Sequence, residues 1–481
     1  MSPLSVIITI ACYFAAMISL SIVSGRKQKG DSEYFRGRGN TSWYVVAFAM
    51  IGACFSGVTF VSVPGMVGSS AFGYLQMCLG FIVGYFLIAF VLIPVYYKLN
   101  VVSIYQYLEN RFGAASYKTG AWFFFISKIL GSSVRLFLVC MALQLLVFSP
   151  LGLPFALNAA VSMAIVLAYT FKGGVASVIR NDNLKTFCMI VSVLLCLIFI
   201  ARDLGLSFKG TASLISGSEM SRIFFFDDVN HPQFFWKQFL GGIFTVLAMT
   251  GLDQDLMQRS LSCKNRQDSQ KNLIVSTFVQ TIVIFIFLCL GVLLYRFASV
   301  HGISETGDAL FPAVATSGIL PPVVGIMFVL GLVSCAYSAG GSALTALTTS
   351  FTVDIIGTAG KEAGKVSRTR KIVHMAITVA MWGIICLFAI FNNTSTIDAV
   401  YKLASYTYGP ILGMFAFGIL TKAKVRDKWV PAAAIAAPLI CLVLQTNSEK
   451  WFGGYTFSYE LLPLNAALVF LFLCCLIKKP E

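Results

Sequence analysis

Long apolar runs separated by short polar loops dominate the pattern of this chain. The hydrocarbon core of a bilayer is about 30 Å thick, and a helix that rises about 1.5 Å per residue crosses it with about 20 apolar residues. The pattern therefore predicts an all-α integral membrane protein with about 13 transmembrane helices. The predicted spans are 4–23, 42–69, 74–97, 120–147, 155–171, 183–201, 235–255, 273–296, 321–352, 372–391, 399–420, 429–445 and 461–477.

The composition excludes a soluble protein. Of the 481 residues, 58% are hydrophobic and only 11% are charged, whereas a soluble domain has about 25% charged residues. The net charge of +15 does not indicate a nucleic-acid partner, because the basic residues lie in the loops between the apolar runs. All but one of the 13 Cys lie inside apolar runs, which gives no disulfide framework. We infer no obligate protein partner.

The basic residues also predict the orientation of the chain. If the runs alternate in direction, the loops that follow odd-numbered runs hold most of the 35 Lys and Arg residues. Short loops rich in Lys and Arg stay in the cytoplasm. We therefore predict a multi-pass protein in the lipid bilayer of the cell (inner) membrane, with its N-terminus outside and its C-terminus in the cytoplasm.

Two of the runs contain helix breakers. Glycines and a proline interrupt 42–69, and glycines interrupt 235–255. A single glycine is explained by helix packing, but breaks of this kind also free backbone groups, which are tolerated where they line a cavity. The two runs are five spans apart, as in transporters built from two inverted five-helix repeats. We predict an extra helix and loop at 1–40, repeats at 41–203 and 235–421, an outer loop at 204–234 and two further helices at 422–481.

Two cations lie inside the run 120–147. A charge at a helix centre costs about 2.5–3.5 kcal/mol on insertion scales, and Lys128 and Arg135 leave the same helix face. Lys128 lies near enough to the inner end to reach the interface by snorkelling. Arg135 lies deeper, and a guanidinium without an acidic neighbour on its own helix face needs an anion. We predict that an anionic group of a substrate supplies it.

Hydroxyl side chains gather in the run 321–352, where Ser338, Ser342 and Thr345 recur at helical spacing. Their oxygens suit a hard cation such as sodium. A hydroxyl in a helix also often bonds only to its own backbone. The spacing alone leaves both explanations open.

Motifs in these regions resemble the sodium/solute symporter family, which includes bacterial sodium/galactose, sodium/proline and sodium/sialic-acid transporters. The resemblance runs over nearly the whole chain, and the order and spacing of its motifs are specific. The motifs are EYFRGR at 33–38, SGVTFVSVPG at 56–65, GGVASVIRNDNLK at 173–185, GLDQDLMQRSL at 251–261 and TTSFTVDI at 348–355. The resemblance implies the LeuT-type architecture of two inverted five-helix repeats, with sodium as the transported ion.

The resemblance also implies where sodium binds. It places the main site at three backbone carbonyls and one hydroxyl, those of Gly52, Phe55, Cys335 and Ser338. Ala339 is a departure, because the family has a further hydroxyl there. Some members hold a second sodium at an aspartate near the inner gate, which matches Asp182, with Ser342 as a hydroxyl ligand.

Lys185 is a second departure, because the family usually has glutamine at this position. It lies three residues after Asp182. Its ammonium either pairs with that carboxylate or stands in for a sodium ion by neutralising the same oxygens. The sequence leaves both explanations open, and both make Asp182 and Lys185 candidates for gating or coupling.

Substrate-lining positions follow from the same resemblance. They are Ser56, Thr59, Cys78, Val246 and Met249, beside Arg135. Thr59, Cys78 and Val246 cannot replace the amide and carboxylate hydrogen bonds of sodium/galactose members, which weakens a hexose substrate. Ser56 and Thr59 resemble the hydroxyl pair of the sialic-acid members, and Arg135 lies one turn beyond the arginine that those members use for a carboxylate.

These observations predict a secondary active transporter that carries a small polar, anionic solute into the cell with sodium, by alternating access. None of the 3 His residues belongs to a metal-ligand pair or a nucleophile–base set, so we expect no enzyme. A proton-coupled or sodium-independent transporter of the same fold is the alternative. A membrane nutrient sensor is the alternative from another class, although a sensor normally needs a cytoplasmic output domain.

Overall fold

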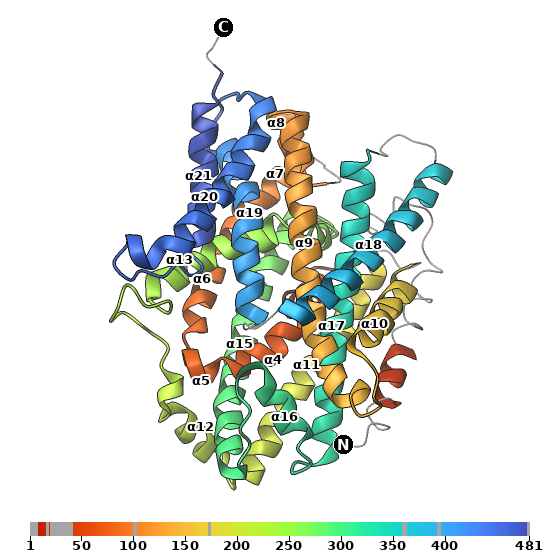
Figure 1. Ribbon diagram of the computed structural model, residues 1–481, viewed down its shortest axis with the longest axis vertical. Helices are drawn as coiled ribbons and strands as arrows, with labels where there is room; N and C mark the ends of the chain where they lie inside the picture. Colours follow the sequence, from red (N-terminus) through yellow and green to blue (C-terminus); the bar gives the residue numbers. More distant parts are fainter. Residues whose placement is uncertain are drawn as a thin grey trace.

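The computed structural model describes residues 8–15, 19, 42–99, 103–171, 175–357, 363–391 and 396–478, without the side chains of 146, 175–181, 336, 338, 363, 391 and 396–399. Most of the predicted span 4–23 therefore lies outside the described residues. The described part is helical, and its one β-type pairing is an isolated bridge between Val425 and Ile477. Along the long axis of the molecule, the C-terminus lies at one end and α12 and α16 at the other (Figure 1).

The helices follow one another with short connections. The first group is α3 (Trp43–Cys54), α4 (Gly57–Gly65), α5 (Val67–Ser70), α6 (Tyr74–Leu87), η1 (Ile88–Leu92), α7 (Ile93–Leu99), α8 (Gln106–Arg111), α9 (Ala114–Leu143), η2 (Gln144–Phe148), α10 (Phe155–Thr170) and α11 (Val175–Asp203). Next come α12 (Phe208–Ser216), η3 (Glu219–Ser221), α13 (Phe235–Val246), η4 (Leu247–Gly251), α14 (Gln254–Ser260), α15 (Arg266–His301), η5 (Gly307–Ala309) and α16 (Leu310–Thr316). The last are α17 (Pro322–Ser350), η6 (Phe351–Ile355), α18 (Ala363–Phe391), α19 (Thr396–Leu420), η7 (Asp427–Trp429), α20 (Val430–Trp451) and α21 (Leu461–Cys475).

The predicted spans from the second onward fall on these helices. In the described residues, 8 helices are long and apolar enough to cross a membrane, and the bent pair α3 and α4 makes 9. The helices α10 and α21 are apolar but shorter. The all-helical membrane fold is therefore confirmed, whereas a count of 13 spans stays a prediction.

Both predicted helix breaks are present. The helix α3 ends at Cys54, α4 begins at Gly57, and the two are bent by 59°. In the second broken run, η4 ends at Gly251 and α14 begins at Gln254. Asp253 caps α14, because its Oδ1 accepts the backbone N–H of Asp255 at 2.9 Å. The sequence thus ends one helix and starts another inside each run.

Glycines let the broken segments pack closely on their neighbours. A Cβ on Gly80 of α6 would overlap the backbone of Phe239 in α13, and a Cβ on Gly242 would overlap Met77. A Cβ on Gly52 of α3 would in the same way overlap Thr186 of α11. Small residues at such crossings give membrane helices their van der Waals contact. The pairs α6–α13 and α3–α11 are therefore held at short range beside the breaks.

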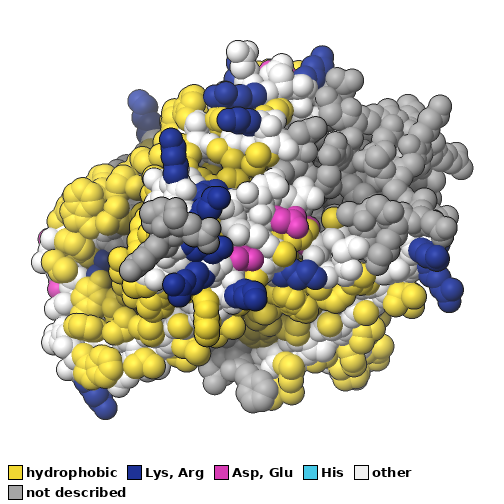
Figure 2. Space-filling model, turned by 90° about the horizontal axis from the view of Figure 1, so that it is seen from above, with side chains coloured by type: hydrophobic (Ala, Val, Ile, Leu, Met, Phe, Trp, Pro, Cys, Tyr) yellow, Lys and Arg dark blue, Asp and Glu magenta, His cyan; other side chains and the backbone are white. Residues whose placement is uncertain are grey.

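Basic side chains gather on the end of the molecule that carries the C-terminus. Seen from this end, Lys and Arg side chains lie on the face, and hydrophobic side chains lie along its left and lower margins (Figure 2). Lys264, Lys422, Lys424, Arg426 and Lys428 are exposed residues of the loops before α15 and α20. The side of the membrane on which this face lies stays a prediction.

Candidate substrate and cation sites

A cavity of ≈ 130 Å³ lies where the two helix breaks meet. Its wall combines polar and apolar side chains. The charged ones are Lys128, Arg135, Asp253 and Asp255, the uncharged polar ones include Ser56, Thr59, Tyr85, Ser127, Ser132, Thr245, Gln280 and Ser342, and the apolar ones include Phe55, Phe81, Val246, Met249 and Ile284. The cavity therefore offers a small solute both charged and apolar contacts.

Most of the predicted substrate residues line this cavity. Ser56 and Thr59 lie at the start of α4, where the backbone N–H of Ser56 donates to Thr59 Oγ1 at 3.4 Å. Val246 and Met249 come from the second broken segment. Cys78 is different, because its side chain is fully buried in α6 and does not belong to the cavity wall.

Arg135 of α9 lines this cavity, and no described carboxylate of the protein pairs with its positive charge. Its side chain is half-buried, and no described residue makes a hydrogen bond or an ion pair with it. A guanidinium presents its donors as a rigid fork that matches a carboxylate. Because a partly dehydrated, unpaired cation is costly, the geometry favours an anion in the cavity.

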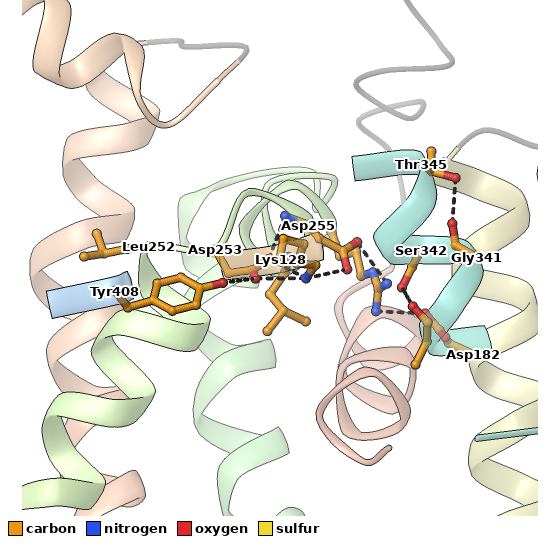
Figure 3. A network of polar contacts seen from close by, with 12 residues as sticks. Lys128, Asp182, Leu252, Asp253, Asp255, Gly341, Ser342, Thr345 and Tyr408 are labelled. Carbon is orange, nitrogen blue, oxygen red and sulfur yellow. Dashed lines mark hydrogen bonds and ion pairs between the residues drawn. The ribbon is translucent and has the colours of Figure 1, made fainter. Parts of the chain in front are cut away.

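Lys128, two turns earlier on the same helix, is buried and paired. Its Nζ lies 2.9 Å from Asp253 Oδ2 and 3.2 Å from Asp255 Oδ2. Tyr408 of α19 donates from its hydroxyl to Asp253 Oδ2 at 2.8 Å. Figure 3 shows these side chains pointing toward one another from separate helices. Lys128 is therefore part of a buried polar network and does not snorkel to the interface.

The network continues across the molecule through Arg259. Its Nη2 donates to Asp255 Oδ1 at 3.0 Å, and its Nη1 lies 2.9 Å from Asp182 Oδ2. The network thus joins α9, α14, α11 and α19 along one side of the cavity. Asp253, Asp255 and Arg259 were part of a motif in the sequence, but their pairing was not predicted. The available signal was three charged residues within seven positions, directly after a predicted helix break.

The residues predicted to bind the main sodium ion lie where α3, α11 and α17 meet. Gly52 belongs to the last turn of α3 and Phe55 follows that helix, and the last carbonyls of a helix lack intrahelical donors. Cys335 is fully buried in α17. The side chain of Ser338 lies outside the described residues. Carbonyl oxygens in this position fit a hard cation.

The hydroxyls further along α17 bond to their own helix. Ser342 Oγ donates to the carbonyl of Ala339 at 3.2 Å, and Thr345 Oγ1 donates to the carbonyl of Gly341 at 2.8 Å. Back-bonding of this kind was one of the two explanations that the spacing left open. The donated proton leaves the lone pairs of each oxygen available, so it is compatible with cation binding.

A second cavity of ≈ 1030 Å³ lies beyond a pair of tyrosines. Tyr74 and Tyr401 line the first cavity, and their hydroxyls are 2.7 Å apart. Tyr401 packs edge-on against Tyr459, which lines the second cavity. Lys402 also lies in the wall of this outer cavity. The first cavity is therefore separated from the second by aromatic side chains, whereas the charged network closes another side.

Two broken helices around one cavity define the fold of a LeuT-type secondary transporter. The model of the family described as "Sodium:solute symporter family" matches residues 34–426. The chain belongs to this family. It is therefore a sodium-coupled secondary transporter and not an enzyme.

Individual relatives are more distant. The chain is 24% identical over 470 residues to the sodium/sialic acid symporter NanT of Aliivibrio fischeri, covering 93% of this chain and 89% of that protein. It is 25% identical over 474 residues to the sodium-coupled monocarboxylate transporter 2 of Danio rerio, covering 94% and 72%.

Solved structures share the fold. One is a substrate-bound, outward-open sodium-coupled sialic acid symporter, with a TM-score of 0.83, 18% identity and 99% of both chains covered. Another is Mhp1, a nucleobase-cation-symport-1 family transporter, with a TM-score of 0.54, 12% identity, and 91% of this chain and 92% of that chain covered. The predicted fold class is thereby confirmed.

Proposed function

We propose that this protein carries a small carboxylate into the cell together with sodium. The observation behind the proposal is the contrast between the two cations of α9. Lys128 is held by two carboxylates of the protein, whereas Arg135 reaches the cavity without an anionic partner among the described residues. A substrate carboxylate supplies the missing charge and accepts the guanidinium donors.

The relatives agree with this substrate chemistry. The sodium/sialic acid symporter and the sodium-coupled monocarboxylate transporter are named for solutes that share a carboxylate. Ser56 and Thr59 lie in the same cavity as Arg135 and offer hydroxyls for the rest of the solute. The proposed substrates are therefore solutes with a carboxylate, whether the rest of the molecule resembles sialic acid or a small monocarboxylate.

Sodium binds at the end of α3 in this proposal. The carbonyls of Gly52, Phe55 and Cys335 and the hydroxyl of Ser338 are its ligands, so the ion ties α3 to α17. Moving one sodium ion down a potential of 100 mV releases about 2.3 kcal/mol. This energy drives solute accumulation when the repeats 41–203 and 235–421 rock against each other around the cavity.

The direction of transport follows from the proposed orientation. With the basic face in the cytoplasm of the cell and the N-terminus outside, the larger cavity faces outward. The tyrosines Tyr74 and Tyr401 form the thin outer barrier, and the ionic network around Asp182 and Arg259 forms the inner one. No obligate protein partner is required by this arrangement.

A binding experiment with purified protein tests the proposal. Melting temperatures are measured with pyruvate, lactate and N-acetylneuraminate, each compared with its amide, in sodium or choline chloride. Only the carboxylates are expected to stabilise the protein, and only with sodium. Arg135→Gln should remove the effect, Arg135→Lys should weaken it because the fork is lost, and Lys402→Gln in the outer cavity should leave it unchanged. Stabilisation by the amides to the same extent would contradict the proposal.

A further inference from the structure

Lys185 is a fully buried cation without a hydrogen-bond partner. Its side chain is 0% exposed, and no described group accepts a hydrogen bond from its Nζ. It belongs to α11, and its electrostatic neighbours are the Asp182 carboxylate, the Arg259 guanidinium and the thiols of Cys335 and Cys54. A buried ammonium costs several kcal/mol unless oxygens or counter-charges compensate it. Its position beside the second predicted cation site, at Asp182, therefore needs an explanation.

Simple pairing with the neighbouring aspartate does not explain this position. The Asp182 carboxylate lies 2.9 Å from Arg259 Nη1, which belongs to another helix. No ion pair joins Lys185 to Asp182 in the described part of the chain, although the two residues are one helical turn apart. The structure therefore does not show the pairing with Asp182 that the sequence left open as one explanation of Lys185.

The charges of the ion-paired network balance when Lys185 is included. The network contains the carboxylates of Asp182, Asp253 and Asp255 and the cations of Lys128 and Arg259. Taken together, these groups have one negative charge in excess, which a bound sodium ion would neutralise. Lys185 supplies the same charge from the chain itself. A sodium ion added at Asp182 would leave an uncompensated positive charge in a buried place.

We infer that the ammonium of Lys185 takes the place of the second sodium ion, the one predicted at Asp182 and Ser342. An ammonium on a flexible stem is a compact point charge, suited to the position of a monovalent ion. The chain then binds one sodium, where the two candidate sites seen in the sequence would give two. This inference rests on the sodium coupling of the chain but not on its carboxylate substrate.

Sodium binding to the purified protein tests the inference without any solute. Radioactive sodium is titrated onto the wild type and onto Lys185→Gln, Lys185→Met and Lys185→Arg. The wild type and Lys185→Arg should bind one sodium per molecule with a Hill coefficient near one. Lys185→Gln and Lys185→Met should each bind one additional sodium. Lys402→Gln is the matched control, because it removes a lysine charge from the outer cavity, and its sodium count should equal that of the wild type.

The outcomes separate the two ideas. Two sodium ions on the wild type would overturn the role of Lys185, even if the variants fail to fold. An unchanged count in well-folded Lys185→Gln and Lys185→Met would overturn it as well. No sodium on the wild type with one ion on Lys185→Gln would support the replacement and contradict sodium coupling. No sodium on any of these proteins would overturn both.

Discussion

Lys128 and Arg135 show how one helix face gives two similar residues different roles. Both project from α9 toward the same cavity. Lys128 lies where Asp253 and Asp255 approach from the second helix break, so its charge is compensated within the protein. Arg135 lies two turns further along α9 in the same cavity wall, and no described carboxylate makes an ion pair with it. The position along the helix, rather than the residue type, separates the cation that is paired within the protein from the one that we propose to bind the substrate.

Ala339 is a residue at which the cation site can be strengthened. Ala339→Ser adds a hydroxyl one position after Ser338, where the family has one. One charge-assisted contact contributes about 1.5 kcal/mol, so the sodium concentration for half-maximal binding should fall about tenfold. Sodium titration of the purified variant measures it. Ala346→Ser adds the same group two turns further along α17 and serves as the control; equal effects of both substitutions would argue against the proposed site.

At the scale of elements, the ionic network holds separate helices together on one side of the cavity. It connects α9 to α14 through Lys128, and α14 to α11 through Arg259 and Asp182. Tyr408 adds α19. Such a buried network depends on complete pairing, because removing one partner leaves a charge in a low-dielectric place. We therefore expect it to respond to the balance of charge more than to the loss of any single hydrogen bond.

Two substitutions test this balance. Lys128→Met leaves a carboxylate unpaired, which costs about 3–5 kcal/mol for a buried pair, so solute uptake should fall more than tenfold and the melting temperature should drop. Lys128→Met combined with Asp253→Asn restores the balance and should recover part of both. Tyr408→Phe removes one hydrogen bond without changing charge and should be milder than Lys128→Met. A double variant as unstable as the single one would contradict this explanation.

The sequence predicted the elements well because their signals are local. Apolar length marks the spans, and Gly57 and Gly251 lie at the breaks Cys54–Gly57 and Gly251–Gln254, whereas Pro64 lies inside α4 and Gly241 and Gly242 lie inside α13. The partners in the network are not local: Lys128 and Asp253 lie 125 positions apart. Cys78 was assigned to the cavity from the resemblance to relatives, but its side chain does not line the cavity. Whether an aligned residue faces a cavity depends on the rotation of its helix, here α6. Packing between helices determines which charged side chains pair and how each helix is rotated. The periodicity of the sequence does not predict either.

At the scale of the molecule, two cavities lie in sequence across the fold. Tyrosine side chains separate them, and the charged network lies at the end of the inner one. In the proposed mechanism, the aromatic contact and the ionic contacts open alternately. We expect the aromatic barrier to open with small side-chain movements and the network to open only when whole helices separate.

Labelling from outside intact cells tests the orientation. In a background with Cys12, Cys474 and Cys475 replaced by serine, Glu305→Cys should react with a membrane-impermeant maleimide. Lys264→Cys should react only after permeabilisation. Both positions are exposed. The reverse pattern would contradict the predicted sidedness.

The native cysteine beside the inner position should not obscure this result. Cys263 is only 3% exposed, and burial raises the pKa of its thiol to about 12. The thiolate is the reactive form, so at neutral pH this residue is both shielded and protonated. As a control, we expect the maleimide not to label Cys263 of the wild type even in permeabilised cells.

Uptake into proteoliposomes tests the central claim, sodium-driven transport of a carboxylate bound by Arg135. Labelled pyruvate and N-acetylneuraminate are offered with an inward sodium gradient, with choline as the control, to the wild type and to Arg135→Gln. We predict that the wild type accumulates at least one of them only with sodium. Uptake by Arg135→Gln should be more than tenfold lower, because one charge-assisted contact is lost. The variant should still bind sodium. Sodium-independent accumulation, or equal uptake by Arg135→Gln, would contradict the account.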